Sequence, residues 1–117
     1  MKYKLSSEPT FLKVSVLSVD NPQDLYSGLD TLMTAHLDRH FIVNVSGLNL
    51  KESYAKEIQR LLDKFKTGKR SIIFITSVED LSFFDERSPV VPTFVEAVDF
   101  LEMEEIERKL TGEGEEE

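Results

Sequence analysis

Two short apolar runs limit what this chain can fold into. Residues 41–45 and 71–76 are rich in β-branched and aromatic side chains, which is typical of central strands covered on both faces. Between them, apolar residues recur at helical spacing over residues 53–66, and Gly68 is positioned to end that helix. The residues predicted to be buried on it are Tyr54, Ile58, Leu61, Leu62 and Phe65. A strand, a helix and a strand of this size require a crossover, so the two strands are predicted to be parallel neighbours.

The sequence before the first run predicts two further strands and a helix. Residues 11–17 alternate between two faces, as a half-buried strand does, and a shorter strand at residues 3–6 precedes them. Asn21 and Pro22 are typical of an N-cap and the first residue of a helix, which then extends to about residue 38. Its apolar stripe consists of Leu25, Leu29, Leu32, Met33 and His36.

The sequence after the second run predicts a less regular segment and then a long helix. Residues 78–87 predict one short helical turn, and residues 89–91 predict a short edge strand, where a proline is tolerated. Pro92 and Thr93 open a last helix that extends to about residue 110. Its candidate buried positions are Phe94, Val98, Leu101, Ile106 and Leu110.

These elements predict a single α/β domain over residues 1–110. We expect a mixed, largely parallel sheet of four to five strands with about four helices packed against it. Residues 111–117 are predicted to form a flexible acidic tail.

The acidic charge is concentrated near the end of the sequence. Residues 1–90 hold 12 basic and 12 acidic side chains, whereas residues 91–117 hold 2 and 10, which accounts for the net charge of -8. This balance argues against nucleic-acid binding, which needs basic side chains to neutralise phosphates. The first residues do not resemble a secretory signal, and no apolar run approaches the ~20 residues of a membrane helix. We therefore expect a cytoplasmic protein that binds neither nucleic acid nor membrane.

Few features of the sequence point to catalysis. The chain has no cysteine, and its five glycines are scattered singly, which excludes thiolate chemistry and argues against a phosphate-binding loop. The two histidines, His36 and His40, are four residues apart, as metal ligands on one helix face would be. A metal-assisted hydrolase using this pair is one hypothesis, but His36 belongs to the apolar stripe and the sequence nominates no further ligand. We expect no enzyme activity, no metal and no cofactor.

Two groups of residues are candidates for binding another protein. Lys56, Arg60 and Lys64 recur every four residues along the second predicted helix, opposite its buried face. They form either a solvated surface paired with Glu57 and Asp63 or a face that binds a partner. The Phe83-Phe84 pair likewise either plugs the core beneath a loop or makes an exposed protein contact.

The segment that joins the first apolar run to the second helix carries a further candidate. Residues 46–55 read Ser-Gly-Leu-Asn-Leu-Lys-Glu-Ser-Tyr-Ala, and Ser53 is predicted to be the N-cap of the helix. The start of a helix is also where free backbone N–H groups best accommodate a phosphate. Ser53 is therefore interpreted either as the N-cap of the helix or as the position where a phosphate would be accommodated.

The order strand, strand, helix, strand, helix, strand, helix resembles the STAS domains of anti-sigma-factor antagonists. In that family a buried strand, similar here to residues 42–46, leads through a short loop into an acidic–Ser–Ser–Gly turn and then a helix. The second serine of the turn is phosphorylated by a partner kinase that is also an anti-sigma factor. The proline–threonine pair at residues 92–93 and the Glu-Ala-Val-Asp stretch at residues 96–99 resemble the start of the family's last helix. The resemblance covers nearly the whole chain.

The family's turn can be placed on this sequence in two registers. In one, Glu52 is the acidic residue, Ser53 the first serine, Tyr54 the phosphoserine position and Ala55 the glycine. In the other, Lys51 falls on the acidic position, Ser53 is the phosphoserine and Tyr54 falls on the glycine. We prefer the second, because it keeps Ala55, Ile58 and Leu62 on the family's apolar helix positions. Neither register supplies both the serine and the glycine.

The resemblance implies a non-enzymatic regulator of transcription that binds another protein. The partner would be an anti-sigma factor or a serine-kinase-like regulator, and a homodimer is also possible in such a module. Ser53 and Tyr54 are the phosphorylation candidates. The expected partner-binding residues are Glu52, Lys56, Arg60, Lys64, Phe83 and Phe84. The alternative is a degenerate, unswitched adaptor or scaffold that presents the same surface constitutively.

Overall fold

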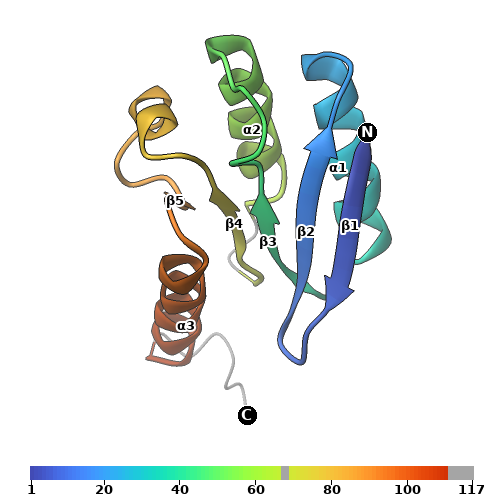
Figure 1. The fold of residues 1–117 in the computed structure, drawn as a ribbon. Helices are drawn as coiled ribbons and strands as arrows, with labels where there is room; N and C mark the ends of the chain where they lie inside the picture. The colour runs from blue at the N-terminus through green and yellow to red at the C-terminus, as the bar shows by residue number, and fades with distance from the viewer. Residues whose placement is uncertain (67–68, 111–117) are drawn as a thin grey trace.

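The structure is a computed structural model, and its description is given for residues 1–66 and 69–110. Figure 1 shows a sheet with helices on both faces. The elements are β1 (Lys2–Ser7), β2 (Phe11–Ser18), α1 (Pro22–Ala35), β3 (His40–Asn44), α2 (Glu52–Lys64), β4 (Ile72–Ile75), the 3-10 helix η1 (Glu79–Phe83), β5 (Val90–Val91) and α3 (Phe94–Leu110). Gly68 and the predicted tail at residues 111–117 lie outside the described residues.

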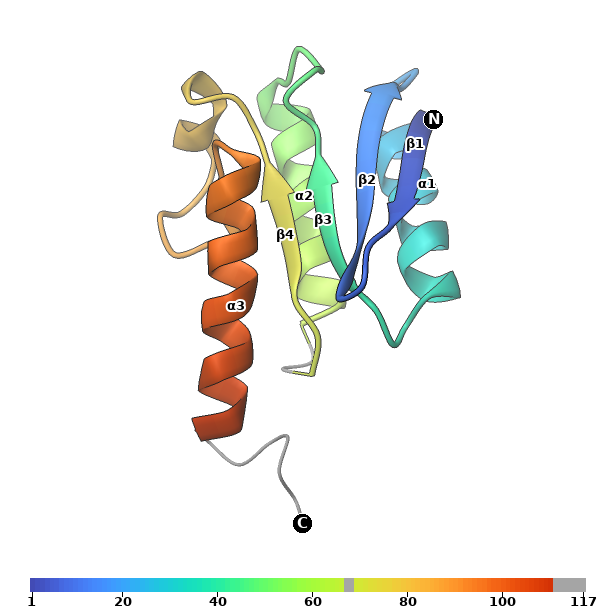
Figure 2. The same ribbon diagram turned by 60° about the horizontal axis from the view of Figure 1, so that its bottom comes forward.

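The five strands lie in the sheet in the same order as in the chain, β1-β2-β3-β4-β5. β1 pairs antiparallel with β2, and each later pair is parallel. The β2–α1–β3 and β3–α2–β4 connections each lead to the next strand on the same side. Because such crossovers are right-handed, α1 and α2 lie on one face of the sheet. Figure 2 shows these two helices behind the sheet and α3 in front of it.

The prediction of a mixed, mostly parallel α/β sheet is therefore confirmed, with five strands among the described residues. The prediction of about four helices is only partly met among the described residues, because three α-helices are present and the fourth helical segment is the five-residue 3-10 helix η1. No helix in the described ranges is long and apolar enough to cross a membrane.

The sheet separates two apolar cores. The larger core lies between the sheet and the α1–α2 layer, and the smaller one lies under α3. The alternation of β2 produces this division, since Leu12 and Val14 face the larger core and Phe11 faces the smaller. The isoleucines of the smaller core are Ile42, Ile73 and Ile75, which α3 covers with Ala97 and Leu101.

The start of α1 is as predicted. The Asn21 side chain accepts a hydrogen bond of 2.8 Å from the backbone N–H of Asp24, and Pro22 is the first helical residue. The Asp24 carboxylate accepts hydrogen bonds from the Asp20 backbone N–H and from the N-terminal ammonium group. These two donors, that of Asp20 foremost, lower the pKa of Asp24.

The end of α1 depends on a residue far along the chain. The helix stops at Ala35, three residues earlier than predicted, and a turn then leads into β3. The buried guanidinium of Arg70 donates hydrogen bonds to the carbonyls of Met33, His36 and Arg39, at 3.2, 2.8 and 3.3 Å. It thereby satisfies carbonyls that a helix end leaves without donors.

The buried positions predicted for α3 are mostly wrong. Leu101 is buried and Val98 half-buried, but Phe94, Ile106 and Leu110 are exposed. Figure 2 shows the reason, since only one side of α3 meets the sheet and its C-terminal part extends past the strands. The small side chain of Ala97, which a search for large apolar residues overlooks, is fully buried.

Candidate functional site

The loop after β3 and the first turn of α2 lie at the carboxyl ends of the parallel strands. Asn44 holds the loop, because its Oδ1 accepts hydrogen bonds from the backbone N–H and the hydroxyl of Ser46. Leu50 is buried and anchors the loop in the larger core. Helix α2 begins at Glu52, and its N-cap is Lys51, whose side chain makes no capping hydrogen bond.

The prediction that Ser53 caps this helix is therefore wrong. Ser53 lies inside the first turn and is exposed, whereas Tyr54 is half-buried and packs against the larger core. The carbonyl of Lys51 already accepts hydrogen bonds from the backbone N–H groups of Tyr54 and Ala55, which leaves a side-chain cap less to do. Ser53 thus presents its hydroxyl to solvent at the positive end of the helix dipole.

The buried side of α2 includes the residues on which the preferred register rests. Ala55, Ile58 and Leu62 are all buried. That register places the phosphoserine on the exposed Ser53 rather than on the half-buried Tyr54. Phosphorylation itself stays a prediction.

Two of the three basic residues on α2 are engaged with nearby side chains. Arg60 pairs with Glu57 and lies over the Tyr26 ring, 4.3 Å from its centroid. Lys64 pairs with Asp30 of α1 at 2.7 Å, and this hydrogen bond raises the pKa of Lys64. These contacts tie α2 to α1.

Lys56 and Asp63 differ from that pattern. The expected pairing of the basic stripe with Asp63 is not seen, because Asp63 instead accepts a hydrogen bond from Gln59. Lys56 is exposed and pairs with no acidic group in the part of the chain that the structure describes. Lys56 is consequently the member of the stripe that remains available to a ligand.

The Phe83-Phe84 pair divides between the two predicted roles. Phe84 is half-buried, packs against the larger core and lines an open hollow of about 390 Å³ together with Leu81 and Val90. Phe83 is 42% exposed and Val78 is 69% exposed. Figure 1 shows η1 at the same end of the sheet as the start of α2. An apolar surface therefore lies at the same end of the molecule as Ser53.

Replacing each phenylalanine separately will test this division. We expect Phe84→Ala to lower the free energy of unfolding by about 2 kcal/mol, because the half-buried ring contributes about half the stabilisation of a fully buried phenylalanine. Phe83→Ala is the matched control and should change it by less than about 0.5 kcal/mol. Urea unfolding followed by circular dichroism measures both, and equal losses would contradict the assignment.

The two histidines do not form a metal site. His40 begins β3 rather than continuing α1, so the pair does not share a helix face. Nδ1 of His40 accepts a hydrogen bond of 2.9 Å from the Ser71 backbone N–H, and Nε2 contacts Glu105 of α3. Within residues 1–66 and 69–110 no three His, Cys, Asp or Glu side chains are placed to hold a metal ion. The hydrolase hypothesis therefore has no support from the histidines' positions.

Ser71, His40 and Glu105 also do not form a catalytic triad. The Ser71 hydroxyl accepts a hydrogen bond from Arg108 at 2.8 Å, and Ser71 is 1% exposed. His40 contacts the serine's backbone rather than its hydroxyl, so the contact between nucleophile and base is missing. This network fastens α3 to the starts of β3 and β4. Sequence reasoning missed it because the partners are 31 or more residues apart.

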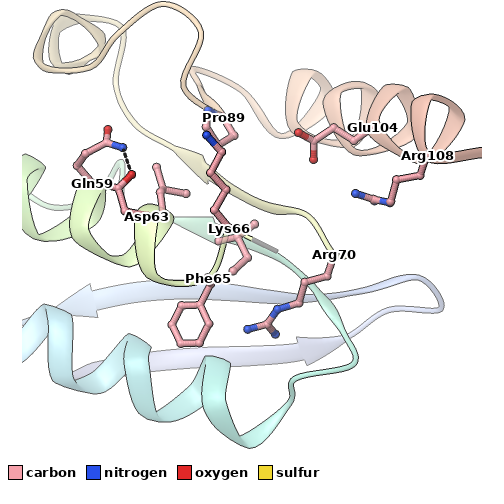
Figure 3. A pocket seen from close by; sticks show the side chains of 10 residues that line it. Gln59, Asp63, Phe65, Lys66, Arg70, Pro89, Glu104 and Arg108 are labelled. Carbon is pink, nitrogen blue, oxygen red and sulfur yellow. Dashed lines mark hydrogen bonds between the residues drawn. The ribbon is translucent and has the colours of Figure 1, made fainter. Parts of the chain in front are cut away.

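A pocket of about 250 Å³ lies between the end of α2 and α3 (Figure 3). Four of its polar side chains, those of Gln59, Asp63, Arg70 and Arg108, already have partners in the fold, whereas Lys66 and Glu104 make no side-chain hydrogen bond or ion pair within the described residues. Figure 3 shows the Arg70 guanidinium pointing away from Lys66 toward α1, and the hydrogen bond that Gln59 donates to Asp63. Arg108 is bonded to Ser71. The pocket is smaller than the usual 300–1,000 Å³ of ligand sites, and we interpret it as a packing seam.

The strand order gives a further reason to look outside cavities. Open α/β sheets bind ligands where the strand order reverses. The described strands follow one another across the sheet in chain order, so the strand order reverses nowhere among them. The exposed residues at the carboxyl ends of the strands are then the better candidate site.

Comparison with known proteins adds no family to this description. No protein-family model matches the chain, and no curated protein matches it.

Proposed function

We propose that this protein is a cytoplasmic, non-enzymatic regulatory module that binds another protein, resembling an anti-sigma-factor antagonist of the STAS family. The observation that carries the proposal is the exposed Ser53 in the first turn of α2, a helix without a side-chain cap. The order of the elements and the burial of Ala55, Ile58 and Leu62 support the resemblance. The partner would be an anti-sigma factor or a serine-kinase-like regulator.

The proposed contact surface lies around Ser53 at the carboxyl ends of the strands. Glu52 and Lys56 are exposed on α2, and Phe83 is exposed on η1. Arg60 and Lys64 lie further along α2, where contact with a partner would compete with their ion pairs. The surface therefore combines an aromatic side chain with charges of both signs.

Phosphorylation of Ser53 would change the charge of this surface. A phosphate adds about -1.5 to -2 charges and is favoured at a helix start. Lys56, three residues further on, lies on the same side of the helix and can pair with the phosphate. A partner that binds Lys56 would then lose that contact. Phosphorylation of Ser53 would thereby weaken binding of the partner.

The switch is tested by replacing Ser53 with Asp and with Ala. We expect the two variants to differ by at least tenfold in affinity for a partner purified from the native cells, which corresponds to about 1.4 kcal/mol. Isothermal titration calorimetry measures this difference. Ser27→Asp and Ser27→Ala are matched controls, since Ser27 is exposed on α1, and they should not differ.

The outcomes separate the two forms of the proposal. Equal affinity of the Ser53 variants, combined with binding by the wild type, favours the unswitched adaptor. Absence of phosphate on both Ser53 and Tyr54 in protein isolated under several growth conditions, measured by mass spectrometry, would also remove the switch.

A further inference from the structure

Helix α3 has a second apolar surface, most of which takes no part in the fold. It is formed by Phe100, Met103, Ile106 and Leu110, which we call the outer patch. Met103, Ile106 and Leu110 are 59%, 52% and 80% exposed, and Phe100 is half-buried. These residues recur at helical spacing, so their side chains form a continuous strip along the C-terminal part of α3.

Phe100, at the edge of the outer patch, also packs against the smaller core, but Met103, Ile106 and Leu110 are not required to hold α3 on the sheet. Ala97 and Leu101 are the residues that α3 buries in the smaller core, and the contacts of His40 with Glu105 and of Ser71 with Arg108 fasten it further. An exposed helix face that serves only solubility carries polar residues. Grouped, exposed apolar side chains instead mark interaction sites.

A hollow of about 310 Å³ lies within this surface. Phe100 and Met103 line it together with two carboxylates, those of Glu104 and Glu107. The hollow combines apolar side chains with negative charge, so it suits a side chain that has an aliphatic stem and a cationic end. Lysine and arginine have this form.

The charge around the outer patch is strongly negative. Helix α3 carries six acidic residues and two basic ones, and one of the basic ones, Arg108, is directed to Ser71. The exposed acidic residues on its outer side are Glu96, Asp99, Glu102 and Glu107. Residues 111–117, which follow in sequence, contain four glutamates and no apolar side chain, so they bring further negative charge and no apolar cover.

This charge distinguishes among possible occupants. A second copy of the chain would bring its own glutamates against these, and like charges across an interface are unfavourable. An anionic lipid surface would be repelled in the same way. A basic segment would be attracted and could also cover the apolar strip.

We infer that the outer patch of α3 binds a basic amphipathic helix of a partner protein. The apolar face of that helix packs on Phe100, Met103, Ile106 and Leu110, and its lysines or arginines lie against the flanking glutamates. This is the helix-in-groove mode of recognition. The inference is independent of the Ser53 surface, which lies at the opposite end of the sheet.

The inference is tested with a designed probe and the full chain. The probe is a fluorescein-labelled, 18-residue helical peptide with leucine on one face and lysine on the other, and fluorescence anisotropy measures its binding. We expect the double variant Met103→Ser/Ile106→Ser to weaken binding at least tenfold, because two apolar side chains no longer become buried. The matched control, Leu17→Ser/Leu37→Ser, removes two leucines exposed elsewhere and should bind within twofold of the wild type.

A charge variant provides a second, independent measurement. Glu102→Gln/Glu107→Gln should weaken binding about fivefold and reduce its dependence on salt, since exposed charges act through screened attraction. Equal binding of a peptide with the same composition in scrambled order, or equal losses in the leucine control, would overturn the inference. A wild-type dimer that Met103→Ser/Ile106→Ser converts to monomer, or binding to phosphatidylserine vesicles that this variant abolishes, would also overturn it by assigning the patch to another occupant.

Discussion

Replacing Arg70 by methionine is expected to lower the free energy of unfolding by about 3 kcal/mol, because three backbone carbonyls at the end of α1 and in the turn after it would lose a charged donor. Arg70 is only 9% exposed, and its guanidinium also lies 5.0 and 5.7 Å from the ring centroids of Phe65 and Phe41. Burial lowers the pKa of Arg70, so the protein keeps a charge there against the preference of the apolar surroundings. The carbonyls at the end of the helix dipole provide the compensation.

Methionine is the informative replacement since it preserves much of the side-chain volume and removes the donors. Urea unfolding followed by circular dichroism measures the loss, and the melting temperature should fall by roughly 10 to 20 °C. Arg87→Met is the matched control, because the Arg87 side chain is 91% exposed and reaches Asp85 only at 3.6 Å. A loss below about 1 kcal/mol for Arg70→Met would mean that water replaces the guanidinium as donor.

Replacing Phe74 by alanine is expected to lower the free energy of unfolding by about 4 kcal/mol. Phe74 is fully buried on β4, a strand with neighbours on both sides, and faces the core beneath α1 and α2. The loss combines the transfer of a large apolar side chain with the cavity that remains. It is a large part of the total stability expected for one domain, about 5–15 kcal/mol.

Two further variants keep this prediction testable. Phe94→Ala removes an exposed ring whose contacts are Phe11, with centroids 6.1 Å apart, and the Lys13 ammonium, and should cost about 1 kcal/mol. If Phe74→Ala does not fold, Phe74→Leu should still fold and lose about 1.5 kcal/mol. Equal effects of Phe74→Ala and Phe94→Ala, measured by urea unfolding, would contradict the assignment of the core.

The fold is predictable from the sequence where local patterns decide it. The strands β3 and β4 are marked by continuous β-branched and aromatic residues, and the start of α1 by Asn21 and Pro22. These signals depend on residues a few positions apart, and the alternation of β2 likewise predicts its two faces. The parallel pairing follows from the helices between the strands, so the topology needs little further information.

The side of α3 that is buried is not predictable in the same way. Apolar residues occur on more than one side of this helix, so the sequence offers two apolar stripes. Which stripe is buried depends on the sheet that the helix packs against. Ala97 fits the close contact with the isoleucine surface, whereas Ile106 and Leu110 lie where the sheet has ended. The fixation of α3 by His40 and Ser71 is equally non-local.

The candidate site shows a similar division. The position of Ser53 near the start of a helix is predictable, but its role as an N-cap is wrong by two residues because the helix begins at Glu52. The separation of Phe83 from Phe84 depends on how η1 lies against the core, which periodicity over so short a segment does not specify. The prediction that the two histidines share a helix face is wrong because α1 ends at Ala35, before either histidine.

The position of α3 on the face opposite the other helices has a consequence for synthesis on the ribosome. Neighbouring strands are consecutive along the chain, so the hairpin and each crossover can form in order as the chain emerges. Ile42, Ile73 and Ile75, however, stay uncovered until residues 94–110 have been made. Until α3 has emerged and packed, the sheet would present one uncovered apolar face, and chaperones or aggregation would compete for that nascent chain.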